Sequence, residues 1–252
     1  MHINSDINIL GGLTDWNLIK VFLLEDNDSI NEKGGVHTFT AIKTDKSVKR
    51  FEKAIRTTLL SNKRSDLEII IRRAIKISAI NTDTLLLLFW NASSNNELLF
   101  HLNDKVFFPA FYSGRASIKS NEVEACLNEL KQTEDELKKW SDITVTTTAS
   151  KYLTLLKKFG LMEGSVNKRI VHPYLSDAMF ILFAYWIAAI SQKPNLVNSH
   201  WLHYCFSEKQ AFLDRLLQKK FSKYFNVVYT GDKLSIEPII PYELIYEQIT
   251  KS

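Results

Sequence analysis

The sequence predicts a mainly α-helical protein: a helical bundle-like N-terminal part, a winged-helix-like segment, and a C-terminal helix followed by a β-hairpin. Three observations support this. Only 5 prolines and 8 glycines interrupt 252 residues, apolar side chains recur mostly at a spacing near 3.6, and 45% hydrophobic residues are enough to build a buried core. No internal repeat or flexible linker divides the chain.

Three helices are expected in the N-terminal domain, which we place at residues 1–112. The first covers residues 44–60, begins at Thr44 or Asp45, and repeats apolar residues at helical spacing. The second covers the segment SDLEIIIRRAIKI at residues 65–77. The third, TDTLLLLFWN at residues 82–91, is apolar enough for a buried strand as well, and its length favours a helix.

The second domain is placed at residues 113–252, after a break around FFPAFYSGRAS at residues 107–117. One long helix is expected over residues 121–140, where six acidic residues against three lysines give it an acidic face. The apolar run at residues 178–190 is read as a buried core helix. Near the C-terminus we expect a helix capped by Ser207, followed by two strands joined at Gly231 and Asp232.

The segment at residues 146–173 has the order expected of a helix and a wing. A helix over residues 146–159 would bury Ala149, Tyr152 and Leu156 and turn a polar, acid-free face outward. Gly160 can end that helix, and LMEGSVNKRIV offers two short strands around a tip. The candidate DNA contacts on this helix and wing are Thr147, Ser150, Lys151, Thr154, Lys158, Lys168 and Arg169.

This arrangement suits double-stranded DNA because small hydroxyls and lysines on a helix can enter the major groove while wing cations meet phosphates. The preceding acidic segment carries the opposite charge, so the elements present faces of opposite sign. The alternative is an ordinary surface helix that happens to be followed by a hairpin.

A second basic concentration lies between Lys43 and Lys76, where 11 lysines and arginines oppose 4 acidic residues. Its side chains could follow phosphates along a duplex, although a solvated charged helix would look the same. No aromatic residues alternate with these cations, so stacking on single-stranded bases is not indicated. The candidate contacts here are Lys46, Lys49, Arg50, Lys53, Arg56, Arg72 and Arg73.

No constellation of residues predicts catalysis, a metal site or a cofactor. His200, His203 and Cys205 lie close together, but no further ligands complete a four-ligand site. The sequence contains no glycine-rich phosphate loop, no nucleophile elbow and no carboxylate–histidine set typical of nucleases. We therefore expect a non-enzyme that needs no cofactor.

Cysteine usage and hydropathy indicate the cytoplasm. Cys126 and Cys205 are the two cysteines, and their separation predicts neither a zinc pair nor a disulfide framework. The N-terminus does not read as a secretory leader. The longest apolar run, at residues 178–190, has 13 residues, fewer than the roughly 18 to 20 needed to cross a bilayer. Net charge is +4, a mild excess that is compatible with an anionic partner.

The order of these segments resembles the BrxA family of BREX phage-defence systems. The resemblance is carried by GGL at residues 11–13, KRFEKAIRTTLL, TLLLLFW, SDITVTTTASKYLTLLKKFGLMEG and IVHPYLSD, and it extends over residues 9–177. It implies a helical, non-enzymatic accessory protein that binds DNA and works beside the methyltransferase, ATPase and phosphatase-like proteins of its operon. Two other functions fit the residues: a protein-interaction scaffold of the defence complex, or a winged-helix transcriptional regulator.

Overall fold

The fold is taken from a computed structural model, which describes residues 3–14, 16, 18–24, 42, 44–61, 65–77, 80–191 and 195–250. The chain forms two compact units. The first comprises Met1–Ser61 and Ile75–Val171, and the second comprises Asn62–Ala74 and His172–Ser252. Residues 112 and 113 both lie in the first unit, so the compact units divide the chain differently from the expected domains.

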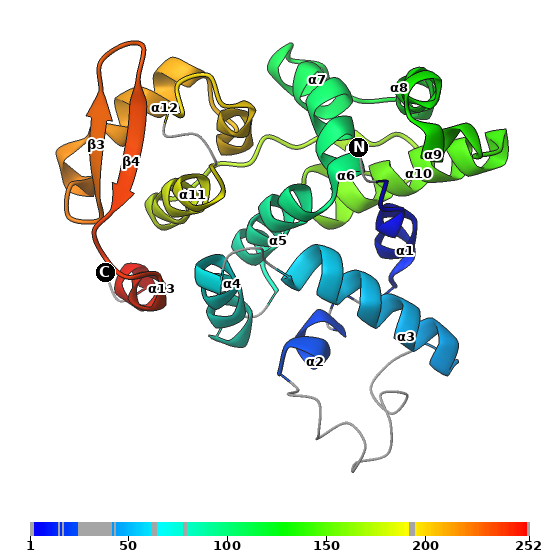
Figure 1. Cartoon of the computed structure of the whole chain (residues 1–252), viewed down its shortest axis with the longest axis horizontal. Helices are drawn as coiled ribbons and strands as arrows, with labels where there is room; N and C mark the ends of the chain where they lie inside the picture. The colour runs from blue at the N-terminus through cyan, green and yellow to red at the C-terminus, as the bar shows by residue number, and fades with distance from the viewer. Residues whose placement is uncertain are drawn as a thin grey trace. The chain divides into compact units, whose positions relative to one another are not determined.

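The prediction of a mainly helical protein is confirmed, and Figure 1 shows helices throughout the first unit. The region expected to be one helix over residues 44–60 is helical, but its last six residues, Ile55–Leu60, form a π-helix. The helices of the first unit are α1 (Asp6–Gly12), α2 (Leu18–Leu24), α3 (Asp45–Ala54), α5 (Thr82–Asn95), α6 (Glu97–Leu102), α7 (Phe108–Tyr112), α8 (Ser120–Thr133), α9 (Asp135–Lys138) and α10 (Asp142–Lys158). A second π-helical segment, Asn103–Phe107, joins α6 to α7, and the strands β1 (Met162–Glu163) and β2 (Arg169–Ile170) follow α10.

The second unit confirms the expected core helix and C-terminal hairpin. It contains most of α4 (Ser65–Ile77), α11 (Asp177–Ile190), α12 (Lys209–Leu216), β3 (Phe225–Tyr229), β4 (Leu234–Pro238) and α13 (Tyr242–Thr250). Ten of the 14 residues of α11 are buried, as expected for a helix that is apolar on all sides. Strands β3 and β4 pair antiparallel, with Tyr229 opposite Leu234 at the turn.

Helix boundaries in the second half of the chain differ from the expectations. The single helix expected over residues 121–140 is two helices, because Glu134 has extended backbone angles (φ −106, ψ 113) between α8 and α9. Acidic residues are favoured in the first turn of a helix, and Asp135 and Glu136 start α9 there. The helix expected after a Ser207 cap has Glu208 as its N-cap, begins at Lys209 and ends at Leu216.

The helix expected over residues 146–159 is longer than predicted and begins at Asp142. Ser141 caps it, because the Ser141 hydroxyl accepts a hydrogen bond from the Thr144 backbone N–H at 3.2 Å. The break expected at residues 107–117 is shorter, since α7 continues to Tyr112.

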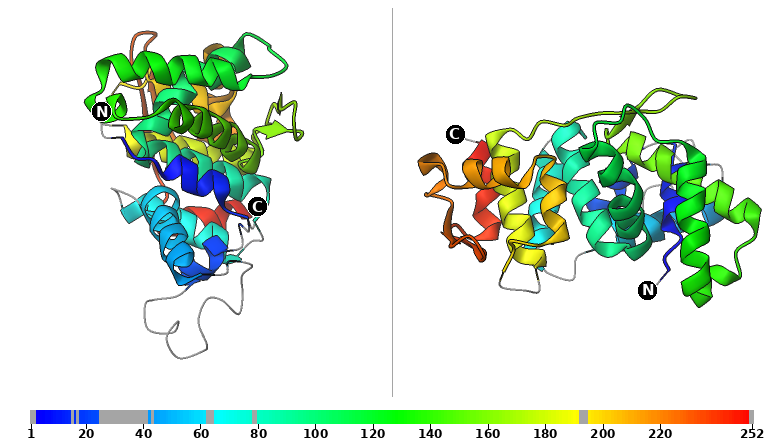
Figure 2. Two further views of the ribbon diagram at one scale, coloured as in Figure 1. Left: turned by 90° about the vertical axis from the view of Figure 1, so that its right-hand side faces the viewer. Right: turned by 90° about the horizontal axis from the view of Figure 1, so that it is seen from above.

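Helix α1 lies between α10 and α3, and side chains on both sides fix it there (Figure 2, left). On one side, the Asn8 amide nitrogen donates to the Thr148 hydroxyl at 3.0 Å. On the other, the Asp6 carboxylate accepts hydrogen bonds from the hydroxyls of Thr57 and Thr58, each at 2.8 Å. Leu10 is fully buried, so α1 ties the π-helical end of the α3 region to α10.

The contact between α1 and α10 is a backbone contact. A Cβ added to Gly11 would lie 2.6 Å from the Lys151 carbonyl oxygen, closer than carbon and oxygen can approach. A Cβ added to the neighbouring Gly12 would meet only the end of the flexible Lys151 side chain, at 3.7 Å. Glycine is therefore required at position 11 by packing, and the adjacent glycine is not.

Lys158 completes this junction by capping the C-terminus of α1. Its amine donates hydrogen bonds to the carbonyl oxygens of Gly11 at 2.9 Å, of Leu10 at 3.2 Å, and of Leu13. The Leu10 and Gly11 carbonyls lie in the last turn of α1, where positive charge is favoured, and the Leu10 carbonyl also accepts from the Leu13 N–H at 3.2 Å. Burial, with a smaller effect of Lys151, lowers the pKa of Lys158 to about 8, so the amine is mostly protonated at pH 7.

Gly11→Ala should destabilise the protein by about 1–3 kcal/mol, because α1 must move away from the Lys151 backbone. Gly12→Ala is the matched control and should be neutral or stabilising by up to about 1 kcal/mol, since alanine is the better helix former. Urea denaturation followed by circular dichroism measures both. Equal stability of the two variants would show that α1 does not pack this closely on α10.

Lys158→Met should lower the free energy of unfolding by about 1–3 kcal/mol, because it removes the amine that donates to the carbonyls at the end of α1. Lys157→Met removes the same charge from the adjacent residue, which is exposed, and should change stability by less than about 0.5 kcal/mol. If both variants unfolded at the same urea concentration, Lys158 would have no capping role.

Candidate nucleic-acid interface

The position of α10 is set by its buried face. Tyr152, Leu155 and Leu156 are fully buried, and the Tyr152 hydroxyl donates to the Asn103 side-chain oxygen at 2.9 Å. At its end, Phe159 packs against Trp16 and Phe89, with ring centroids 5.3 and 5.5 Å apart. Because α10 packs on the core and on α1, one face of this helix remains exposed to solvent.

The exposed residues of α10 include several with hydroxyl groups and one lysine, with Asp142 and Ile143 in the first turn. Of the predicted contacts, Thr147 and Ser150 are exposed, Thr154 and Lys151 are half-buried, and Lys158 is directed to α1. Thr146 and Lys157 are exposed as well, although neither was among the predicted contacts. Lys157 lies seven residues after Ser150, on the same helical face, and that spacing could have identified it.

A short hairpin follows α10 where a wing was expected. Strands β1 and β2 pair antiparallel, with Met162 opposite Ile170 and Glu163 opposite Arg169. Gly164 has φ +91, and a Cβ there would lie 2.4 Å from the Asn167 carbonyl oxygen, so the turn requires glycine. Lys168 is half-buried and Arg169 is exposed on this hairpin.

The loop between α7 and α8 supports the hairpin. Ser117 forms an antiparallel bridge with Arg169, and the Ile170 N–H donates to the Ala116 carbonyl at 2.9 Å. The structure thus shows α10 followed by a supported two-stranded hairpin. The assignment to the winged-helix class itself stays a prediction.

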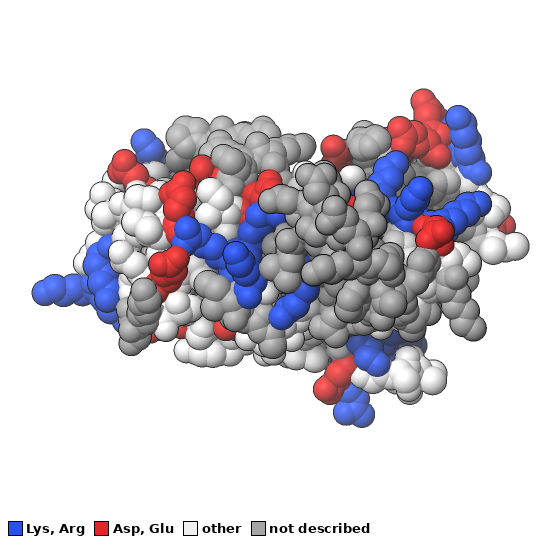
Figure 3. Space-filling view, turned by 90° about the horizontal axis from the view of Figure 1, so that it is seen from below, with Lys and Arg blue, Asp and Glu red and all other residues white. Residues whose placement is uncertain are grey.

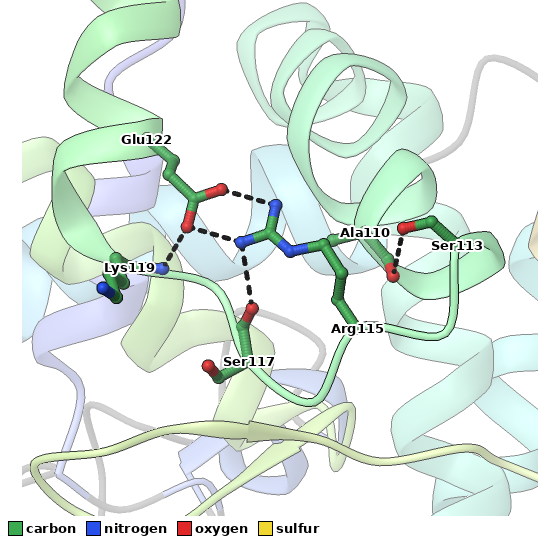
Figure 4. A network of polar contacts seen from close by, with 6 residues as sticks. All are labelled: Ala110, Ser113, Arg115, Ser117, Lys119 and Glu122. Atoms are coloured by element: carbon green, nitrogen blue, oxygen red, sulfur yellow. Dashed lines mark hydrogen bonds and ion pairs between the residues drawn. The ribbon is translucent and has the colours of Figure 1, made fainter.

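A two-point ion pair holds that loop in place (Figure 4). The Arg115 guanidinium contacts both carboxylate oxygens of Glu122, at 2.6 and 2.7 Å, and also donates to the Ser117 carbonyl at 3.3 Å. The Glu122 carboxylate additionally accepts from the Lys119 N–H at 2.8 Å. These bonds from Arg115 lower the pKa of Glu122 and join the start of α8 to the loop that pairs with β2.

The second basic concentration forms an exposed face on α3. Lys46, Lys49, Arg50 and Lys53 are all exposed, and their spacing places them on one side of the helix. Figure 3, which views the side of the molecule where α3 lies in Figure 1, shows Lys and Arg side chains gathered there. We call these four residues the α3 ridge.

The other three predicted basic contacts are engaged within the protein. Arg56 pairs with Glu52 at 2.9 Å and lies over the Phe22 ring, 6.0 Å from its centroid. Arg72 pairs with Glu68 at 2.7 Å, and Arg73 pairs with Glu247. Arg72 and Arg73 belong to the second unit, and the α3 ridge belongs to the first.

Groups that could carry other chemistry are few among the described residues. In that part of the chain, no three His, Cys, Asp or Glu side chains gather as a metal site would need. Burial raises the pKa of Cys126 to about 11 and also raises that of Cys205, so both thiols are protonated at neutral pH. None of the described helices has the length and hydropathy to span a bilayer.

Comparison with known proteins identifies the family. No curated protein and no solved structure matches this chain. The family model of BrxA matches residues 38–184, which is more than half of the chain and includes α3, α10 and the hairpin. The chain therefore belongs to the BrxA family, and it is a component of a BREX phage-defence system.

Proposed function

We propose that this protein is a non-enzymatic accessory component of its defence system that binds double-stranded DNA. The observation that carries the proposal is the exposed face of α10 with the basic hairpin directly after it. Thr147, Ser150 and Lys157 lie on that face, and Lys168 and Arg169 follow on the hairpin.

The chemistry of this surface suits a duplex. Hydroxyl groups donate to and accept from base edges and phosphates, and a helix of 17 residues is about 25 Å long, enough to cross a major groove about 12 Å wide. Lysine and arginine on the hairpin supply phosphate contacts beside it.

The α3 ridge adds a second set of phosphate contacts in the same compact unit. Four exposed cations on one side of α3 attract polyanions and displace their condensed counterions. Because α1 separates α3 from α10, the two surfaces contribute as distinct contact sets, and each can be tested alone.

A protein-interaction scaffold is the second candidate. It is favoured by the exposed acidic residues Glu129, Asp135 and Glu136 on α8 and α9, which would attract a basic partner. Under this alternative, the protein binds no duplex at low salt. It does bind a partner protein encoded in the same operon.

The α3 ridge should account for part of the salt dependence of DNA binding. Replacing Lys49, Arg50 and Lys53 together by Gln should weaken binding and reduce the slope of log affinity against log salt by about 2–3, because about 0.9 counterion is released per phosphate contact. Fluorescence anisotropy with a labelled duplex at several salt concentrations measures both quantities.

The matched control replaces Lys209, Lys219 and Lys233, which are exposed cations of the second unit, and should leave the slope unchanged. An unchanged slope in the ridge variant would remove α3 from the interface. Absence of any complex with wild-type protein at low salt would reject DNA binding altogether.

The α10 face should be sensitive to reversed charge at its exposed lysine and at the hairpin. Lys157→Glu with Lys168→Glu should weaken DNA binding at least tenfold, because each change replaces attraction to a phosphate by repulsion. The fold should be retained, since neither side chain is fully buried. Gel shift and circular dichroism measure the two properties.

Two further variants help to interpret this result. Leu156→Asp places a carboxylate at a fully buried position and should unfold the segment. Lys151→Glu with Lys158→Glu mixes two effects, since Lys158 also caps α1. Wild-type affinity in a folded Lys157→Glu/Lys168→Glu protein would show that this face of α10 does not meet DNA.

A further inference from the structure

Two large apolar side chains of the first unit are left exposed, among the residues that the structure describes. Ile143 is 79% exposed and Val166 is 90% exposed. Ile143 lies in the first turn of α10, and Val166 lies in the loop of the β1–β2 hairpin. Both positions therefore belong to the two elements of the candidate interface, although single exposed apolar residues are common elsewhere on protein surfaces.

Local structure does not require isoleucine at position 143. The first turn of α10 is capped by Ser141 and begins with Asp142, while β-branched residues are weaker helix formers than alanine or leucine. With most of its surface in water, the side chain contributes little to the core. Exposure of this apolar side chain to water is unfavourable, and a ligand that covers it would remove that unfavourable term.

The neighbours of Ile143 indicate what covers it. Thr146, Thr147 and Ser150 follow at three, four and seven residues, the spacing of one helical face, and all three are exposed. An apolar group beside hydroxyls at the start of a helix matches the edge of an A·T pair in the major groove, where thymine presents a C5-methyl group beside hydrogen-bonding atoms.

We infer that Ile143 is a specificity-determining residue that contacts thymine methyl groups in the major groove. The inference rests on the proposed DNA-binding function and assigns to the first turn of α10 the recognition of base edges. In helix-turn-helix proteins it is the N-terminal part of the recognition helix that contacts them. Lys157, Lys168 and Arg169 then hold the phosphates toward the other end of α10.

The test compares duplexes that differ only in this methyl group. One is an alternating A·T duplex, and the other has deoxyuridine in place of every thymidine, so every binding register differs by C5-methyl groups. Wild-type protein should bind the deoxyuridine duplex at least about fourfold more weakly, the factor that corresponds to burial of one methyl-sized group. Ile143→Ala should bind the thymidine duplex more weakly than wild type and should bind both duplexes equally.

Val228→Ala is the matched control. Val228 is a β-branched residue of β3 in the second unit that is 53% exposed, and the variant should keep the wild-type ratio between the two duplexes. Wild-type and Ile143→Ala proteins are each measured with both duplexes, as in a double-mutant cycle. The cycle separates contact between Ile143 and the thymine methyl group from other effects of deoxyuridine. Circular dichroism checks that Ile143→Ala is folded.

The outcomes distinguish the role of Ile143 from DNA binding itself. Equal binding of the two duplexes by wild-type protein, or an unchanged ratio in Ile143→Ala, overturns the role of Ile143 and leaves DNA binding intact. Absence of binding to either duplex at low salt overturns both, and the exposed isoleucine then points to a protein partner.

Discussion

The close approach of α1 to α10 is the constraint on which the first unit depends. It requires Gly11, because any larger residue would press on the Lys151 carbonyl, and it brings the end of α1 within reach of the Lys158 amine. Asn8 and Asp6 then connect α1 to Thr148 on one side and to the π-helical segment on the other. Because α1 covers one side of α10, the direction of the remaining exposed face is fixed by this junction.

The hairpin after α10 depends on a second, independent support. Two paired residues per strand are too few to be stable in water on their own. The chain supplies a third backbone partner, residues 116 and 117, and holds it with the ion pair between Arg115 and Glu122. A guanidinium that meets a carboxylate through two parallel bonds fixes direction as well as distance. The cations of the hairpin are thereby placed relative to α8 and α10.

Sequence patterns were sufficient to predict the core helix α11 and the hairpin of β3 and β4. The apolar run of α11 and the alternation around Gly231 have one physical solution each, a core helix and a hairpin. The start of α10 was misplaced because its threonines are poor helix formers. Helix propensity does not include the capping, hydrogen bonds and burial that stabilise this turn. Ser141 caps the helix and the Thr148 hydroxyl bonds back to the Thr144 carbonyl at 2.8 Å, while Val145 and Ala149 are buried. Packing thus outweighs propensity here.

The candidate site was predictable only as far as one helix determines it. A helical wheel distinguishes the buried face of α10 from its polar face, but it cannot say which polar residues a second helix will cover, and Lys157 and Lys158 differ by only about 100°. The structure assigns Lys158 to α1 and leaves Lys157 in solvent. The exposed face therefore carries an apolar group and hydroxyls toward its start and its cations toward its end and on the hairpin. Base edges are recognised by methyl and hydroxyl contacts and phosphates by charge. In the proposed complex with DNA, we therefore expect the N-terminal half of α10 to face the groove.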